Sequence, residues 1–157
     1  METNPRTQTD HSSSKNPARP RILVADDDHK MLFLLSKVLG DDGYEVATVT
    51  SGRALISRFE PSLGARAAGP FELILADVRM PGCSGLEALE WLRAKGCGIP
   101  FILMTALSEC DLCQRTPELG CTLLAKPFRL ADLRKLVQAS LLGATSQIST
   151  RGESLRG

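Results

Sequence analysis

The feature that most constrains the fold is a mostly apolar segment, 71–76, that delivers one carboxylate, Asp77, to the point where Pro81-Gly82 ends regular structure. An apolar run of this length without alternation is typical of a strand buried on both faces, as in a parallel sheet. Pro-Gly cannot continue a strand. We therefore predict that Asp77 lies at the carboxyl end of a buried strand, although an isolated aspartate in such a place often only caps a turn.

Four other segments also have the composition of strands, and amphipathic segments separate them. The predicted strands are 22–25, 44–48, 71–77, 99–104 and 121–125. The predicted helices begin near residues 29, 51, 84, 108 and 130. Each crossover between parallel strands is right-handed and lays its helix on a face of the sheet. The predicted fold class is therefore α/β, with a five-stranded parallel sheet covered by helices on both faces.

Capping residues and one proline indicate where helices begin and end. Asp28 is placed to cap the first helix, and Ser84 with Glu87 forms a capping-box pattern before the third. Pro117 is expected to interrupt the helix at 108–119, because proline lacks the amide hydrogen that helical hydrogen bonding needs.

The two ends of the chain differ in composition from its middle. Residues 1–20 have almost no apolar side chains and are predicted to be a mobile tail, because they cannot repay the entropy of ordering. Residues 21–142 are predicted to form one domain. Residues 143–157 are predicted to be a short polar C-terminal tail that holds no second domain.

Composition argues against several classes of function. A net charge of +1 offers no electrostatic basis for binding nucleic acid or an anionic membrane. Apolar runs are too short for a bilayer span and the N-terminus lacks the apolar core of a signal peptide, so a cytoplasmic location is expected. The five cysteines are predicted to be reduced thiols. Cys110 and Cys113 have a CxxC spacing, but a zinc site needs four ligands.

Polar residues follow the predicted strands at one edge of the sheet. In a sheet of order 2-1-3-4-5, ligands bind beyond the carboxyl ends of strands one and three. Asp26 and Asp27 follow the first strand and Asp77 ends the third, so three carboxylates should converge. Their repulsion favours a hard cation, and Mg²⁺ is the natural candidate because it binds carboxylates together with phosphate oxygens and water. Thr105 and Lys126 end the last two strands on the same rim.

The motifs at these strand ends match a known family. They are Leu-Val-Ala-Asp-Asp-Asp at 23–28, Leu-Ala-Asp-Val-Arg-Met-Pro-Gly at 75–82, Leu-Met-Thr-Ala at 103–106 and Ala-Lys-Pro-Phe at 125–128. In this order they resemble the receiver domain of bacterial two-component response regulators, over residues 20–142. The resemblance implies a flavodoxin-like, doubly wound (βα)5 fold. It also implies a phosphoacceptor signalling domain, not an enzyme, that assists its own phosphotransfer and autodephosphorylation.

The resemblance further implies a role for each acidic residue. Asp77 would be the phosphoacceptor, taking a phosphoryl group from a phosphohistidine on a partner histidine kinase or phosphotransfer protein. Mg²⁺ would be bound by Asp27, Asp77 and the backbone carbonyl of Arg79. Asp26 would act on the metal largely through water.

The remaining site residues would act on the phosphoryl group. Lys126 would pair with Asp77 and then with a phosphoryl oxygen, while Thr105 would donate a hydrogen bond to another. The Lys126-Pro127 peptide bond would be cis. The phosphorylated domain would present a changed surface to a downstream protein target, and the faces of its last two helices would allow a homodimer.

Departures from the family pattern leave two other hypotheses open. Leu123 stands where the family usually carries Tyr or Phe, and Pro117 falls in a helix that usually contributes to partner binding. These differences motivate an alternative, a receiver fold that serves as an interaction platform without being switched by phosphorylation. A third hypothesis is a haloacid dehalogenase-like phosphohydrolase, whose signature begins with acids such as those at 26–28. Lys30, however, stands where that signature has Thr or Val.

Overall fold

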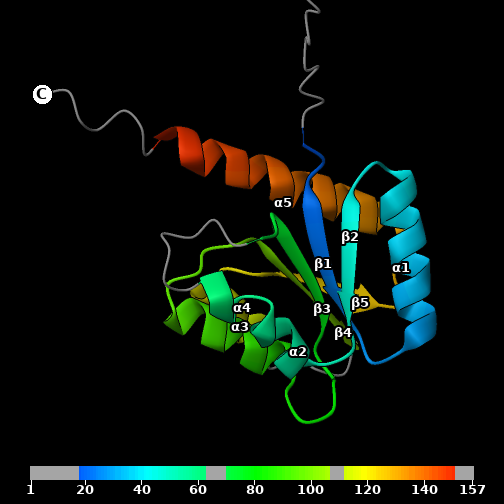
Figure 1. Ribbon diagram of the computed structural model, residues 1–157, viewed down its shortest axis with the longest axis horizontal. Helices are drawn as coiled ribbons and strands as arrows, with labels where there is room; N and C mark the ends of the chain where they lie inside the picture. The colour runs from blue at the N-terminus through cyan, green and yellow to red at the C-terminus, as the bar shows by residue number, and fades with distance from the viewer. Residues whose placement is uncertain (1–17, 63–69, 107–111, 151–157) are drawn as a thin grey trace, which may run out of the picture.

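A five-stranded parallel sheet forms the centre of the computed structural model, which describes residues 18–62, 70–106 and 112–150. The strands lie in the order β2-β1-β3-β4-β5 (Figure 1). They are β1 (Arg21–Ala25), β2 (Glu45–Val49), β3 (Leu73–Asp77), β4 (Phe101–Ala106) and β5 (Thr122–Lys126). The predicted fold class and strand order are therefore confirmed.

Helices cover both faces of this sheet. They are α1 (His29–Asp41), α2 (Gly52–Ser57), α3 (Gly85–Ala94), α4 (Leu112–Leu119) and α5 (Leu130–Thr150), with a 3-10 turn, η1 (Glu60–Ser62), after α2. Side chains alternate between the faces of β3, so Leu75 packs with α1 and α5 in one core cluster. Ile74 packs with α2 and α3 in the other. The buried strands are thus apolar on both sides, as the composition of 71–77 predicts.

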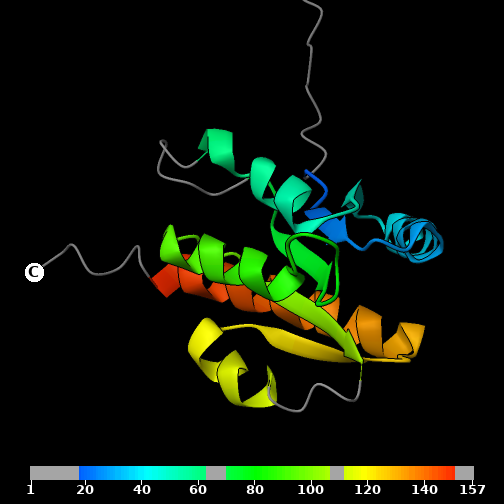
Figure 2. The same cartoon turned by 90° about the horizontal axis from the view of Figure 1, so that it is seen from below.

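The last helix is longer than predicted. α5 continues to Thr150 and spans the molecule in both views (Figures 1 and 2), so residues 143–150 of the predicted C-terminal tail are helical. A glycine inside a helix, such as Gly143, destabilises the helix by only about 1 kcal/mol relative to alanine, and no proline follows it.

Among the described residues, no helix combines the length and apolarity needed to cross a bilayer. Residues 1–17 of the predicted N-terminal tail and 151–157 lie outside the described residues.

The fourth helix also differs from its prediction. α4 includes Pro117 and ends two residues later at Leu119, so the prediction that this proline interrupts the helix is wrong. Arg93 of α3 donates hydrogen bonds to the carbonyl groups of Leu119 and Gly120 where this helix ends. Residues 107–111, with Cys110 and the predicted start of this helix, lie outside the described residues, so the CxxC pair is not tested.

Both predicted helix caps are confirmed, and both lie next to the carboxyl edge of the sheet. Asp28 Oδ1 accepts the Lys30 N–H at 2.8 Å at the start of α1. At the start of α3, Ser84 Oγ accepts the Glu87 N–H at 3.1 Å, and a Glu87 carboxylate oxygen accepts the Ser84 N–H at 2.7 Å. These caps fix the points at which the loops after β1 and β3 enter their helices.

Candidate functional site

The strand register brings the predicted acidic residues together. Ala25 of β1 lies opposite Ala76 of β3, so the next residues, Asp26 and Asp77, extend from neighbouring strands at the same edge. One carboxylate oxygen each from Asp26, Asp27 and Asp77 lies within 4.8 Å of the others. The structure therefore brings together the three carboxylates that the sequence placed at this edge.

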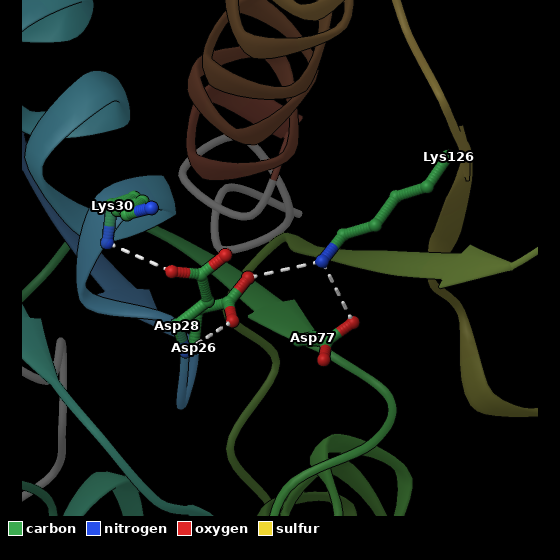
Figure 3. A network of polar contacts seen from close by, with 5 residues as sticks. All are labelled: Asp26, Asp28, Lys30, Asp77 and Lys126. Atoms are coloured by element: carbon green, nitrogen blue, oxygen red, sulfur yellow. Dashed lines mark hydrogen bonds and ion pairs between the residues drawn. The ribbon is translucent and has the colours of Figure 1, made fainter.

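Asp26 is the most deeply buried of the three, with an exposed fraction of 1%. Its Oδ1 accepts the Asp28 N–H at 2.9 Å, and its Oδ2 lies 3.1 Å from the Lys126 amine (Figure 3). Both oxygens thus have partners within the protein. This leaves Asp26 poorly placed as the nucleophile that the phosphohydrolase hypothesis would require.

Lys126 connects two of the carboxylates. Its Nζ lies 3.1 Å from Asp26 Oδ2 and 3.2 Å from Asp77 Oδ1, although β5 is separated from β1 by two strands (Figure 3). Burial lowers the pKa of Lys126, but the hydrogen bond and charge of Asp26, with those of Asp77, outweigh it, so the pKa is raised overall. The amine therefore stays charged. The Lys126-Pro127 peptide bond is cis, as predicted.

The surroundings of Asp77 act on its charge in opposite directions. Only 9% of the residue is exposed, and this burial raises the pKa of its carboxyl group. The nearby Lys126 amine lowers the pKa, while the charges of Asp26 and Asp27 raise it. The net shift is upward, so the ionised carboxylate is less favourable here than in water. A second cation would relieve that cost.

Asp27 faces a cleft at the mouth of the site. The residue is exposed, and the cleft is lined by Asp27, Val78, Arg79, Met80, Pro81 and Ser84. Three carboxylates with one exposed member suit a hard cation such as Mg²⁺, which binds through few protein oxygens and keeps several waters. Among the 78–84 loop residues, the sequence had assigned a metal-binding role only to the carbonyl of Arg79. The other residues of this loop that line the cleft have no ionisable side chain, so nothing in the sequence marked them as part of the site.

Helix α3 fixes the position of the Asp77 backbone. The Val78 N–H donates to the Met104 carbonyl at 2.9 Å, and the Gly85 N–H donates to the Val78 carbonyl at 3.1 Å. A Cβ atom at Gly85 would lie 2.2 Å from the Asp77 carbonyl oxygen, closer than real Cβ contacts. Glycine at the first position of α3 therefore allows the helix to pack directly against the end of β3.

Thr105 lies inside the end of β4, on the strand next to β3. It is 6% exposed, and its hydroxyl donates to the Ala106 carbonyl at 3.1 Å. The register places Asp77 opposite Met104, so Thr105 is one residue further along the same edge.

The contact between Lys126 and Asp26 was not predicted from the sequence. A hundred residues separate the two in the chain, and no motif links them.

Comparisons with known proteins agree with this geometry. Residues 22–138 match the response regulator receiver domain family. The chain is 30% identical over 125 residues to the sporulation initiation phosphotransferase F of Bacillus subtilis (strain 168), covering 77% of this chain and 93% of that protein. It is 34% identical over 138 residues to the transcriptional regulatory protein PrrA of Mycobacterium bovis, covering 87% of this chain but 56% of PrrA.

A solved structure shows the same likeness in three dimensions. The Vibrio cholerae chemotaxis protein CheY4 superposes with a TM-score of 0.67 at 28% identity, covering 79% of this chain and 100% of that structure. Receiver domains are signalling domains, and the matched segment runs from the second residue of β1 through β5 and contains every residue of the acidic site. The chain therefore belongs to the receiver domain family of two-component response regulators.

Proposed function

We propose that Asp77 accepts a phosphoryl group from a phosphohistidine on a histidine kinase or phosphotransfer protein. One Asp77 oxygen forms the new O–P bond while the N–P bond of the donor breaks and the imidazole leaves with the electron pair. The observation that carries this proposal is the position of Asp77, which lies 3.2 Å from Lys126 and within 4.8 Å of two further carboxylates. Phosphoryl transfer depends mainly on positioning and on neutralising charge.

The acidic residues have the chemistry of a Mg²⁺ site. Asp27, Asp77 and the backbone carbonyl of Arg79 would hold the ion, and Asp26, whose oxygens already have protein partners, would act through water. When bound, the ion neutralises charge on the carboxylates and the phosphoryl oxygens. The 78–84 loop and the exposed Asp27 leave one side of the site open to the donor.

Lys126 and Thr105 have roles after transfer. The Lys126 amine would exchange its contact with Asp77 for one with a phosphoryl oxygen, because the acyl phosphate carries more negative charge than the carboxylate. The Thr105 hydroxyl would turn from the Ala106 carbonyl to donate to another phosphoryl oxygen. These movements would change the surface around β4 and β5 that a downstream protein target binds. Attack of water on the acyl phosphate would end the signal. This domain would act on its protein target and would not bind nucleic acid directly.

Phosphorylation by a small donor tests the proposal. Wild-type protein, Asp77→Ala and the surface control Asp41→Ala are incubated with acetyl phosphate, with Mg²⁺ or with EDTA, and analysed by intact mass spectrometry. We expect one added phosphoryl group in wild type and Asp41→Ala, only with Mg²⁺, and none in Asp77→Ala. Labelling that persists in Asp77→Ala, or that needs no Mg²⁺, contradicts the proposal.

Leu123 supports a second candidate function, a platform that binds its partner in one state. Leu123 is half-buried and packs against the same core cluster as Leu119 and Cys121. An aliphatic side chain cannot make the ring rearrangement of an aromatic residue. Partner affinity measured with and without beryllofluoride, a phosphoryl mimic, separates the candidates, because a switched receiver changes its affinity and a platform does not.

A further inference from the structure

The loop at 78–84 links the phosphoacceptor strand to α3 and lines the cleft. Its first end is held by the Val78 N–H, which donates to the Met104 carbonyl at 2.9 Å. Its last residues are held by the Cys83 N–H, which donates to the Pro81 carbonyl at 2.9 Å, and by the cap of α3. The middle of the loop contains Arg79, whose carbonyl is a proposed metal ligand. The position of that carbonyl therefore depends on what holds both ends.

Helix α2 contacts the far end of this loop through its own backbone. The Gly52 N–H donates to the Cys83 carbonyl at 3.2 Å, and Gly52 is buried. A Cβ atom at Gly52 would lie 2.4 Å from the Cys83 carbonyl oxygen and 2.8 Å from its Sγ. A flexible side chain could turn away from such a contact, but a backbone carbonyl cannot. Any side chain at position 52 must therefore displace the loop at Cys83 or displace α2.

We propose that Gly52 is a positioning residue for the phosphorylation site, acting through Cys83 on the 78–84 loop and so on the carbonyl of Arg79. This inference rests on the proposed function, since it assumes that the loop supplies a metal ligand. Gly52 itself touches neither the metal nor the phosphoryl group. Outer contacts that orient a ligand commonly change metal affinity by about tenfold or more.

Coupling of this kind must work in both directions. If the placement of the loop controls Mg²⁺ binding, Mg²⁺ binding must also hold the loop in its packed position. The reactivity of the Cys83 thiol then reports the position of the loop relative to α2, because this thiol lies against Gly52 and is half-buried. Movement of the loop away from α2 would expose more of the half-buried Cys83 to alkylation, so bound Mg²⁺ should slow the reaction.

The first experiment compares Gly52→Ala with Gly40→Ala by Mg²⁺ titration calorimetry and thermal unfolding. Gly40 is a matched control, since it also lies in a helix but has open space around its missing Cβ. We expect Mg²⁺ to bind Gly52→Ala about tenfold more weakly than wild type and Gly40→Ala with wild-type affinity. A Gly52→Ala protein that unfolds at lower temperature but binds Mg²⁺ with wild-type affinity overturns the proposal, because its role would then be structural only.

The second experiment needs no variant and decides the question even if Gly52→Ala fails to fold. Wild-type protein is alkylated with iodoacetamide with and without Mg²⁺, and the modified cysteines are quantified by peptide mass spectrometry. We expect Mg²⁺ to slow alkylation of Cys83 by about fivefold and to leave half-buried Cys97, outside the site, unchanged. Equal Cys83 rates overturn the proposal. Wild type that binds no Mg²⁺ contradicts the proposed function as well, whereas phosphorylated wild type with equal Cys83 rates contradicts this inference alone.

Discussion

The carboxyl group of Asp77 lies where burial makes its ionisation unfavourable. Burial raises the pKa of its carboxyl group, and the Lys126 amine at 3.2 Å reverses only part of that effect. In the folded protein Asp77 therefore binds its proton more tightly than in the unfolded chain. A raised carboxyl pKa means that stability falls as the pH rises from the unfolded pKa through the folded one. At neutral pH, ionised Asp77 is a cost to folding that the proposed phosphoryl transfer would require.

Replacing Asp77 by Asn should remove this cost. In EDTA at pH 7, we expect Asp77→Asn to unfold at a temperature roughly 4 °C above wild type, a shift that corresponds to about 1 kcal/mol in a domain of this size. The difference should disappear below pH 3.8, the ordinary pKa of the group, where Asp77 is protonated in both states. Thermal unfolding followed by circular dichroism measures it. Asp41→Asn, at a highly exposed carboxylate, is the control, and an Asp77→Asn protein less stable than wild type at pH 7 would contradict the argument.

At the scale of elements, α4 depends on a side chain from α3. The Arg93 guanidinium donates to the carbonyls of Leu119 at 2.8 Å and Gly120 at 3.1 Å, where α4 ends. It also donates to the carbonyls of Cys97 at 2.7 Å and Ile99 at 2.9 Å, before β4. Burial lowers the pKa of Arg93, although the group remains a cation. One planar side chain thus joins the segments that precede β4 and β5.

Lysine at position 93 should not replace these contacts. A lysine amine has three donors on a single atom and cannot reach four carbonyls arranged around a planar fork. We expect Arg93→Lys to lower the free energy of unfolding by about 1–3 kcal/mol, because carbonyls that are mostly part-buried lose a charged donor. Urea unfolding measures the loss, and hydrogen exchange should locate it at 119–124. Arg134→Lys is the control, since Arg134 pairs with Asp42 at the surface. Equal stability of Arg93→Lys and wild type would show that the four hydrogen bonds contribute little.

At the scale of the whole molecule, the site gathers residues from the ends of three strands. Asp26 follows β1, Asp77 ends β3 and Lys126 ends β5, so the site exists only in the folded sheet. A cation that binds this edge binds the native state and not the unfolded chain. Mg²⁺ should therefore stabilise the whole domain by mass action, even though it contacts only one edge.

The size of that stabilisation follows from the occupancy of the site. At a Mg²⁺ concentration one hundred times its dissociation constant, we expect wild type to gain about 2.7 kcal/mol of unfolding free energy, and EDTA should remove the gain. Asp27→Asn, which alters the exposed member of the proposed ligand set, should gain much less. Thermal unfolding in MgCl₂, compared with KCl at equal ionic strength, measures both. A wild-type melting temperature that does not respond to Mg²⁺ would contradict metal binding at this site.

Much of the site could be predicted because its residues lie at strand ends. The alternation of strands and helices indicates a parallel sheet, and a parallel sheet places Asp26, Asp27 and Asp77 at one edge whatever the details of packing. The capping patterns of Asp28 and Ser84 are equally local, and both were confirmed. The end of α5 could not be predicted in the same way, because no local signal marks Thr150 and a helix ends where its total contacts stop supporting it.

The sequence by itself determined the α/β fold class and the set of acidic residues, because these follow from periodicity and from residue types within single elements. The strand order was expected from the resemblance to the receiver family, since the pairing of strands is not a property of single elements. Only the tertiary structure decided how Lys126 bridges Asp26 and Asp77, and why Gly52 and Gly85 carry no side chain. Contacts of this kind join residues that lie far apart in the chain at distances of a few ångströms. No local pattern encodes them, because they depend on how whole elements pack against one another.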